Sequence, residues 1–380
     1  MVRLFIPIIV ISLAFISDAY IFHRYINTSS MWRWTWWVPL LVTIGFFTKF
    51  LFFNRGWVEE YATTNIFLLI MVLFCVPKVL FALIYLIPNI GTAVGLFVAI
   101  SIVGIVLWGI TYGFCQLKVR EIVYESENVP TKFDNYKIVQ FSDAHVGTFY
   151  GPYKHLLKES IDTINSLNPD LVCFVGDIEN FSPKELEVHS QAFSSLHAKD
   201  GVMSIMGNHD YSSYIKITDR ERAALIAQTR DKQRSFGWQL LDNENRLIRR
   251  ANDSIYIVGE ENWGNPPFPQ YGNIKKALSG VDRQSFIVML SHDPNAWRGH
   301  LLPEFTPDIT LSGHTHGTQF SIFGWSPSSM MYDEWGGEFY REQDGKKCLL
   351  SVSTGIGGNF PFRFGMPREI VVITLKHKNK

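Results

Sequence analysis

The chain has 380 residues, with 35 basic and 35 acidic side chains and 47% hydrophobic residues. This composition excludes a disordered, collagen-like or disulfide-stapled protein. Zero net charge also argues against nucleic-acid binding through bulk electrostatics. Residues 1–115 carry only six basic and three acidic side chains, which leaves 29 and 32 for the other 265 residues. A nearly uncharged N-terminal third, of net charge +3, therefore precedes a slightly acidic globular domain.

Four apolar runs fill this N-terminal third, at residues 4–22, 34–53, 66–87 and 91–115. Each is close to the ~20 residues that a helix needs to cross the hydrocarbon core of a bilayer. The aromatic cluster MWRWTWW at 31–37 begins the second run, as an interfacial belt does. We therefore expect a transmembrane bundle of about four helices over 1–115, a linker with the first strand over 116–135, and a globular domain over 136–380.

Basic residues near the ends of the runs predict the orientation. One side of a four-span bundle would carry Arg3, Arg55, Lys118 and Arg120, and the other side Arg24 and Arg33. This excess places the N-terminus and the globular domain of a multi-pass integral membrane protein in the cytoplasm. A cleaved signal peptide over the first run is an alternative, because its apolar part is short and polar Ser17 and Asp18 follow. Three spans would still return the domain to the cytoplasm.

Lys78 follows Pro77 inside the third run. A charged side chain is costly within a membrane and by default suggests a function. Lys78 could pair with Asp18 or meet a lipid phosphate. The alternative is that Pro77 kinks the helix and Lys78 only reaches polar neighbours within the bundle.

From about residue 137 the chain changes to short runs of branched apolar residues, each of which stops at a residue able to bind metal. Such runs are typical of buried strands, and they cover 138–142, 171–175, 202–206, 286–290 and 309–312. Residues 154–167 have apolar side chains at helical spacing and predict a crossover helix between the first two strands. If the strands share one sheet system, their carboxyl ends meet at one rim, where open α/β sheets bind ligands.

The side chains expected at this rim are carboxylates, an amide and imidazoles, without a thiolate: Asp143, His145, Asp177, Asn208, His209, His292, His314 and His316. Such a set suits Mn, Fe or Zn better than Mg or Ca alone. Eight groups exceed the needs of one ion, so we expect two divalent ions that share a bridging carboxylate. Two ions about 3.5–4 Å apart generate hydroxide at neutral pH and hold a phosphoryl group during in-line displacement. The pattern therefore predicts hydrolysis of a phosphoester or pyrophosphate.

The order of the motifs, DAH at 143–145, GD at 176–177, GNHD at 207–210, SH at 291–292 and GHTHG at 313–317, resembles the calcineurin-like metallophosphoesterase superfamily. Segments 257–262, 353–358 and 361–370 resemble its bacterial membrane-linked branch, which includes enzymes that split phosphate or pyrophosphate bonds of lipid substrates. The resemblance covers roughly residues 136–376. It implies an α/β fold, a four-layer αββα sandwich in which two packed sheets are flanked by helices.

The same resemblance implies two ligand sets that share Asp177 as the bridge. One ion would be held by Asp143, His145, Asp177 and His316, and the other by Asp177, Asn208, His292 and His314. His209 would act in catalysis as a general acid or as a positive stabiliser of the transition state. In the phosphoprotein-phosphatase branch an acid three residues after the bridging Asp pairs with this histidine, whereas this chain has Asn180. The departure argues against a protein phosphatase; Asp210 or Glu179 could replace the acid.

Tethering a hydrolase to the bilayer would keep its site within reach of a membrane substrate. Connecting segments carry large apolar side chains that could receive acyl chains, although at least half are expected to pack the sandwich edges: Trp263, Phe268, Tyr271, Trp297, Phe323, Trp325, Met330, Met331 and Trp335. A basic stretch over 220–234 is typical of a solvated helix face, with contact to anionic lipid as the alternative.

Three functions remain open. The first is a membrane-anchored dinuclear phosphohydrolase that cleaves a phosphoester or pyrophosphate bond of a lipid-linked substrate by attack of a metal-bridging hydroxide. The second is a phosphodiesterase acting on a soluble nucleotide or diester, with the spans serving only as an anchor. The third is a non-catalytic membrane sensor, against which the complete ligand set argues.

Overall fold

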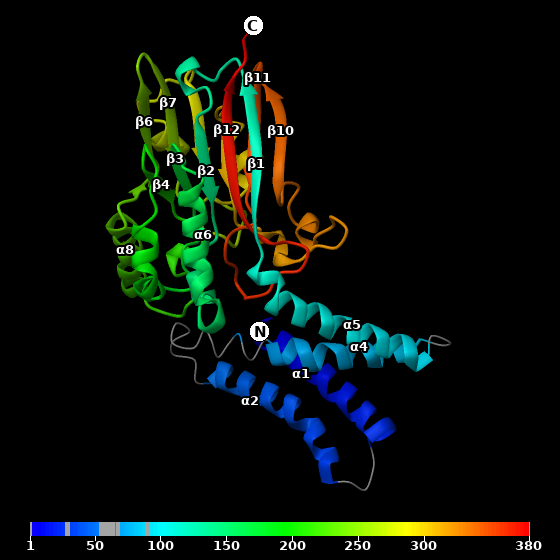
Figure 1. Ribbon diagram of the computed structural model, residues 1–380. Coiled ribbons are helices and arrows are strands. Elements are labelled where there is room, and N and C mark those ends of the chain that lie inside the picture. The colour runs from blue at the N-terminus through cyan, green and yellow to red at the C-terminus, as the bar shows by residue number, and fades with distance from the viewer. Residues whose placement is uncertain (1, 27–30, 53–64, 66–68, 88–90, 380) are drawn as a thin grey trace. The chain divides into compact units, whose positions relative to one another are not determined.

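The computed structural model describes residues 2–26, 31–52, 65, 69–87 and 91–379 (Figure 1). The chain forms two compact units, Met1–Tyr112 and Gly113–Lys380. The first unit is helical, and the second contains all twelve strands of the described residues.

Helices occupy each of the four predicted apolar runs of the first unit. They are α1 Val2–Ile21, α2 Val38–Phe52, α4 Val76–Tyr85 and α5 Gly91–Thr111, with helical turns at Phe22–Ile26, Met31–Trp37 and Met71–Cys75. Within the described residues, one helical stretch, Thr92–Cys115, is long and apolar enough to cross a membrane, with 24 residues and a mean hydropathy of 2.5. The described part of the third predicted run, Met71–Tyr85, is apolar but shorter. Arg55 and residues 88–90 lie outside the described residues.

The Lys78–Asp18 pair that the sequence suggested is present inside the first unit. Nζ of Lys78 lies 2.7 Å from Oδ1 of Asp18, and it also lies over the ring of Trp36, 4.0 Å from the centroid. The helix departs from α geometry over Met71–Cys75, just before Pro77. A proline inside a helix has no N–H to donate, and its ring displaces the carbonyl four residues earlier. The ammonium therefore meets polar and aromatic partners inside the unit.

The second unit is a mixed α/β sandwich of two six-stranded mixed sheets. The first sheet has the order β1-β12-β2-β3-β4-β5, with β1 Leu117–Ser126, β2 Lys137–Phe141, β3 Leu171–Val175, β4 Val202–Ile205, β5 Gln239–Leu240 and β12 Arg368–His377. The second has the order β10-β11-β9-β8-β7-β6, with β6 Glu244–Arg250, β7 Asp253–Gly259, β8 Phe286–Leu290, β9 Ile309–Ser312, β10 Gly337–Gln343 and β11 Lys346–Val352. All five predicted strands are confirmed, but they are divided between the two sheets.

The alternation of side chains along the strands builds the layers. In β2, Ile138 points into the core between the sheets, whereas Val139 packs on the outer face against Ile161 of helix α6, Lys154–Ser166. This helix is the predicted crossover, and Figure 1 shows it over the first sheet. The outer face of the second sheet is covered by the short helix α9, Ile274–Ala277. The remaining α-helices among the described residues of the unit are α7 Ser190–Ser194 and α8 Asp219–Ser235.

Strand β1 belongs to the sandwich, although residues 116–135 were expected to serve partly as a linker. It pairs in parallel with β12 over ten positions, from Leu117 opposite Arg368 to Ser126 opposite His377. Only Gln116 separates this strand from the apolar stretch Thr92–Cys115.

Candidate metal centre

The candidate site lies where strands of both sheets end. β2 and β3 run parallel and are followed within two residues by Asp143 and Asp177. β8 and β9 also run parallel, and His292 and His314 come two residues after their last residues. Because carboxyl ends of parallel strands lie at the same edge of a sheet, both sheets deliver their polar side chains to one region.

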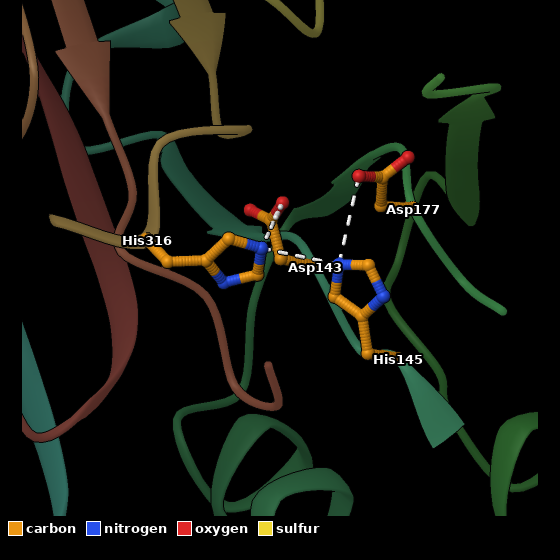
Figure 2. Close-up of side chains that lie close together, drawn as sticks. All are labelled: Asp143, His145, Asp177 and His316. Carbon is orange, nitrogen blue, oxygen red and sulfur yellow. Dashed lines mark hydrogen bonds and ion pairs between the residues drawn. The ribbon is translucent and has the colours of Figure 1, made fainter. Parts of the chain in front are cut away.

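Four of the predicted ligands form a first buried cluster, with ligand atoms within 4.8 Å of one another: Asp143, His145, Asp177 and His316. Figure 2 shows the ring of His145 between the carboxylate of Asp177 and the ring of His316. Nε2 of His145 lies 3.1 Å from Nε2 of His316 and 3.5 Å from Oδ2 of Asp177. Nε2 of His316 lies 3.5 Å from Oδ1 of Asp143.

A second cluster contains Asp177, His292 and His314, again with ligand atoms within 4.8 Å. Oδ2 of Asp177 lies 3.1 Å from Nε2 of His292. Asn208 joins this cluster, because its Oδ1 lies 2.7 Å from Nδ1 of His314. The structure thus brings all seven predicted ligands together, and Asp177 is the residue common to both clusters.

The donor set fits a pair of divalent ions. Burial holds the pKa of His145 and of His316 well below the usual value, so both imidazoles are neutral. Their two Nε2 atoms face each other at 3.1 Å, an arrangement that suits lone pairs directed at one cation. The oxygens of Asp143, Asp177 and Asn208 complete the mixed nitrogen and oxygen set that transition metals prefer.

The buried carboxylates of the centre also favour the binding of positive charge. Burial raises the pKa of Asp143 to about 7. Burial acts in the same direction on Asp177, but the nearby imidazoles of His292 and His209 outweigh it and hold the pKa of Asp177 well below its usual range. Against the effect of its own burial, His292 has its pKa raised to about 10 by the carboxylate of Asp177. Buried carboxylates need such compensation, and divalent cations would supply it.

The backbone at the ligands is strained. Asp143, His145, Asp177, His314 and His316 all have positive φ, between 40° and 72°. Residues other than glycine rarely adopt this conformation, which costs on the order of 1–3 kcal/mol each and clusters at functional sites. A glycine allows the close approach that the centre requires, since a Cβ on Gly313 would overlap the carboxylate of Asp143.

Asp210 organises two of the ligand loops without belonging to either cluster. Its carboxylate accepts hydrogen bonds from the backbone N–H groups of Gly207 at 2.8 Å and of Asp177 and Ile178 at 2.9 Å. It therefore ties the loop that carries Asn208 to the loop that carries Asp177.

His209 takes its partner from the main chain. Its Nδ1 lies 2.7 Å from the carbonyl oxygen of Asn180, so Nδ1–H donates to that carbonyl. The two acids considered as replacements have other partners: Asp210 binds backbone N–H groups, and Glu179 accepts a hydrogen bond from Thr229 at 3.0 Å. Burial lowers the pKa of His209. Asn180 in place of an acid therefore does not deprive His209 of a partner, because the backbone carbonyl of residue 180 accepts its hydrogen bond.

His209, His314 and His316 line a cleft of about 440 Å³. Asp177 also lines it, and the rest of its wall carries no charged side chain, with Phe268, Met331 and Tyr332 among the lining residues. No lysine or arginine lines this cleft in the described part of the chain. Charge on a bound phosphate would therefore be met by cations held at the metal centre.

Sequence reasoning missed three residues that hold the ligands in place. The hydroxyl of Tyr214 accepts a hydrogen bond from Asn208 Nδ2 at 2.7 Å, and Tyr214 also stacks on His209. The hydroxyl of Tyr332 lies 2.9 Å from Nε2 of His314, and Asp293 Oδ2 lies 3.6 Å from the same atom. Only Asp293 could have been found from the sequence, because it directly follows the predicted ligand His292. Tyr214 and Tyr332 lie in irregular segments, where no sequence pattern indicates which side chains meet.

Comparison with known proteins assigns this site to a family. The profile of the calcineurin-like phosphoesterases matches residues 136–318, the stretch from the start of the first ligand strand to just beyond His316. The chain carries a calcineurin-like metallophosphoesterase domain. Its relatives include bacterial metallophosphoesterases, and the domain is that of a hydrolase acting on phosphoester bonds.

Three relatives show the range of this group. An uncharacterized metallophosphoesterase, YkuE of Bacillus subtilis, is 29% identical over 75% of this chain and 96% of its own. A transmembrane protein with metallophosphoesterase domain from Danio rerio is 26% identical over 68% of this chain and 57% of its own. UDP-2,3-diacylglucosamine pyrophosphatase LpxG of Chlamydia trachomatis is 28% identical over 65% of this chain and 86% of its own.

Proposed function

We propose that the chain is a membrane-anchored dinuclear phosphohydrolase that cleaves a phosphoester or pyrophosphate bond of a lipid-linked substrate. The observation that carries the proposal is the sharing of Asp177 by two buried ligand clusters. Asp143, His145 and His316 would complete one metal site, and Asn208, His292 and His314 the other. Bound divalent ions, Mn, Fe or Zn, would activate a water nucleophile and neutralise phosphate charge.

His209 would serve the leaving group. It lines the cleft, and its ring centroid lies 4.6 Å from that of His145. The hydrogen bond from Nδ1–H to the Asn180 carbonyl fixes the ring and leaves Nε2 to meet substrate. Nε2 would act on the departing oxygen as a general acid or charge stabiliser in the imidazolium form, which burial opposes and the carboxylate of Asp177 favours.

The lipid-linked substrate is supported by the character of the cleft and by one relative. Uncharged polar residues such as Thr318, Gln319 and Asn359 line the cleft together with apolar Phe268 and Met331. Such a lining suits a substrate that carries uncharged polar groups and an apolar part next to its phosphate. The relative LpxG is named for the pyrophosphatase reaction on UDP-2,3-diacylglucosamine, a lipid-linked nucleotide.

We further propose that residues 1–115 form a four-span membrane bundle with the N-terminus and the globular domain in the cytoplasm. The helices at all four apolar runs and the apolar stretch Thr92–Cys115 support this arrangement, as does the Danio rerio relative, a transmembrane protein by name. Protease added to intact cells should leave the globular domain uncut until the membrane is permeabilised. Cleavage of the domain in intact cells would place it outside.

The proposed reaction is tested with the full-length protein purified in detergent and supplied with Mn²⁺. Incubated with a membrane lipid extract, it should release phosphate or a nucleotide. Turnover of a soluble nitrophenyl diester without any release from lipid would favour a phosphodiesterase that uses the spans only as an anchor. Failure to hydrolyse either substrate would favour a sensor.

A further inference from the structure

A loop beside the cleft exposes an unusual amount of apolar surface. Residues 321–331, here called the 321–331 loop, present the side chains of Phe323, Trp325, Met330 and Met331 to solvent, with Phe323 fully exposed. The surrounding stretch from Gly317 to Tyr332 contains no charged residue. Loops on the surface of a soluble domain are usually polar, and clustered apolar exposure marks an interaction site.

Packing of the sandwich explains other large apolar residues of the connecting segments, but not these. Trp297 is buried against Leu350 and Val352 of β11, and Trp263 stacks on the ring of His300 with centroids 4.8 Å apart. Four of the nine side chains that the sequence suggested for acyl chains are exposed together in the 321–331 loop. Tyr271 is the one other exposed member of this set, so four of the five exposed side chains lie in one loop.

The loop is built to hold this apolar tip in place. Ile322 and Trp325 exchange two backbone hydrogen bonds of 2.9 Å around a two-residue turn, in which Phe323 and Gly324 both have positive φ, as tight hairpins require. The backbone N–H of Ser321 donates to the carbonyl of Phe364 at 2.7 Å. At the far side, Ser326 Oγ donates to the Gly317 carbonyl at 2.7 Å.

The loop is continuous with the candidate active site. Ser328 and Met331 line the same cleft as His209 and His314. The loop also begins five residues after His316, in one uninterrupted segment. A surface engaged by the tip would thus adjoin the opening through which substrate enters.

We propose that the 321–331 loop inserts its apolar tip into the surface of the lipid bilayer and so presents the cleft to a phosphorylated lipid at that surface. This inference rests on the proposed function. Exposed aromatic and methionine side chains in a stretch that carries no charge from Gly317 to Tyr332 suit the interface between headgroups and acyl chains. One residue, Gln116, links β1 of this domain to the apolar stretch Thr92–Cys115, so the domain has a bilayer within reach. The absence of charged residues from Gly317 to Tyr332 disfavours a protein partner held by charge complementarity with this loop.

The insertion is tested without reference to activity. Phe323→Cys in the full-length protein is labelled with an environment-sensitive fluorophore and reconstituted in vesicles containing brominated lipids. Quenching is expected at position 323 and not at Val188→Cys, which labels an exposed apolar residue of the helical turn Pro183–His189. The unsubstituted chain, labelled in parallel, corrects for Cys115, while the other cysteines are buried. Absence of quenching at position 323 would overturn the proposal, as would a blue shift without quenching, which would place the loop against protein.

A second test links the loop to catalysis. Phe323→Asp should lower the ratio of hydrolysis of a vesicle-embedded lipid phosphoester to that of a soluble diester by about tenfold, the scale set by the transfer of one aromatic side chain. Val188→Asp is the matched control and should leave the ratio unchanged. An unchanged ratio in Phe323→Asp would refute the proposal. If the unsubstituted protein hydrolyses no phosphoester, the proposed function fails, while the quenching result still decides whether the loop inserts.

Discussion

At the scale of single residues, the main chain of Asn180 orients His209. The side chain at position 180 is an amide instead of an acid, yet Nδ1 of His209 lies 2.7 Å from the carbonyl oxygen of the same residue. A main-chain acceptor fixes the ring without adding a negative charge. The imidazole therefore remains oriented while burial lowers its pKa.

This contact predicts different outcomes for two neighbouring substitutions. His209→Ala should lower kcat by about 10²- to 10⁴-fold with the metal content unchanged, because a group serving the leaving oxygen is lost. Asn180→Ala should lower kcat far less, since the main-chain carbonyl remains. Steady-state kinetics and metal analysis of both purified variants would check this. An Asn180→Ala variant as slow as His209→Ala would show that the amide side chain is the essential partner.

The seven candidate ligands could be predicted from sequence because each follows a short apolar run that ends in a recognisable motif. The residues behind them could not. Tyr214 contacts Asn208 and Tyr332 contacts His314. Both tyrosines lie in irregular segments, which have no periodic pattern of apolar residues from which their position could be predicted. A backbone acceptor such as the Asn180 carbonyl leaves no trace in residue type at all.

At the scale of elements, the segment between β11 and β12 is held by a buried arginine. Arg363 donates hydrogen bonds to five backbone carbonyls, those of Thr354, Gly355, Gly357, Met366 and Pro367. The same segment donates from the N–H groups of Ile356 and Gly357 to the carbonyls of Ser142 and Asp143. Arg363 thus supports the strained backbone of a candidate ligand.

Arg363→Met should therefore destabilise the globular domain strongly. Removing a buried charge that satisfies several carbonyls costs about 3–5 kcal/mol, because those carbonyls lose their partner. Arg246→Met is the matched control: that side chain and its partner Glu244 are both half-exposed, so the substitution should cost no more than about 1 kcal/mol. Denaturant unfolding followed by tryptophan fluorescence would measure both. Equal effects of the two substitutions would refute the role of Arg363.

A second element-scale contact predicts a pH dependence. Asp170, just before β3, accepts hydrogen bonds from the N–H of Lys137, from Lys199 and from Arg250 of the other sheet. Burial would raise the pKa of Asp170, but these donors outweigh burial and lower it. The unfolded chain then binds the proton more readily, so the contribution is complete above pH ~4 and is lost as pH falls through the lower folded value.

The variant Asp170→Asn should be less stable than the unsubstituted chain at pH 7, and its stability should fall less on acidification below pH ~4. Denaturant midpoints measured from pH 7 to pH 3 provide the comparison. If the denaturant midpoints of the two proteins fell in parallel as the pH was lowered, Asp170 would not be a source of the loss of stability in acid.

The strands themselves were predictable, but their distribution was not. Apolar runs over 138–142 and 286–290 look alike in sequence, yet they belong to different sheets. Local patterns specify a buried strand, whereas the pairing partner depends on contacts between distant segments. The single predicted rim is therefore made by two sheets whose strands end at the same place.

At the scale of the whole molecule, the zero net charge is the sum of two unlike parts, +3 in residues 1–115 and −3 in the remainder. The acidic part contains the buried carboxylates Asp143 and Asp177. Two divalent cations would reverse the charge at the centre and attract a phosphate there. The metal pair is thus the claim on which the reaction, the substrate and the role of the 321–331 loop all depend.

The number of ions bound per chain tests this claim most directly. The purified full-length protein should contain two divalent ions per chain by elemental analysis, and Asp177→Asn should lose bound metal together with hydrolysis of a soluble diester. At most one ion per chain in the unsubstituted protein, or undiminished turnover by Asp177→Asn, would contradict a dinuclear centre bridged by Asp177.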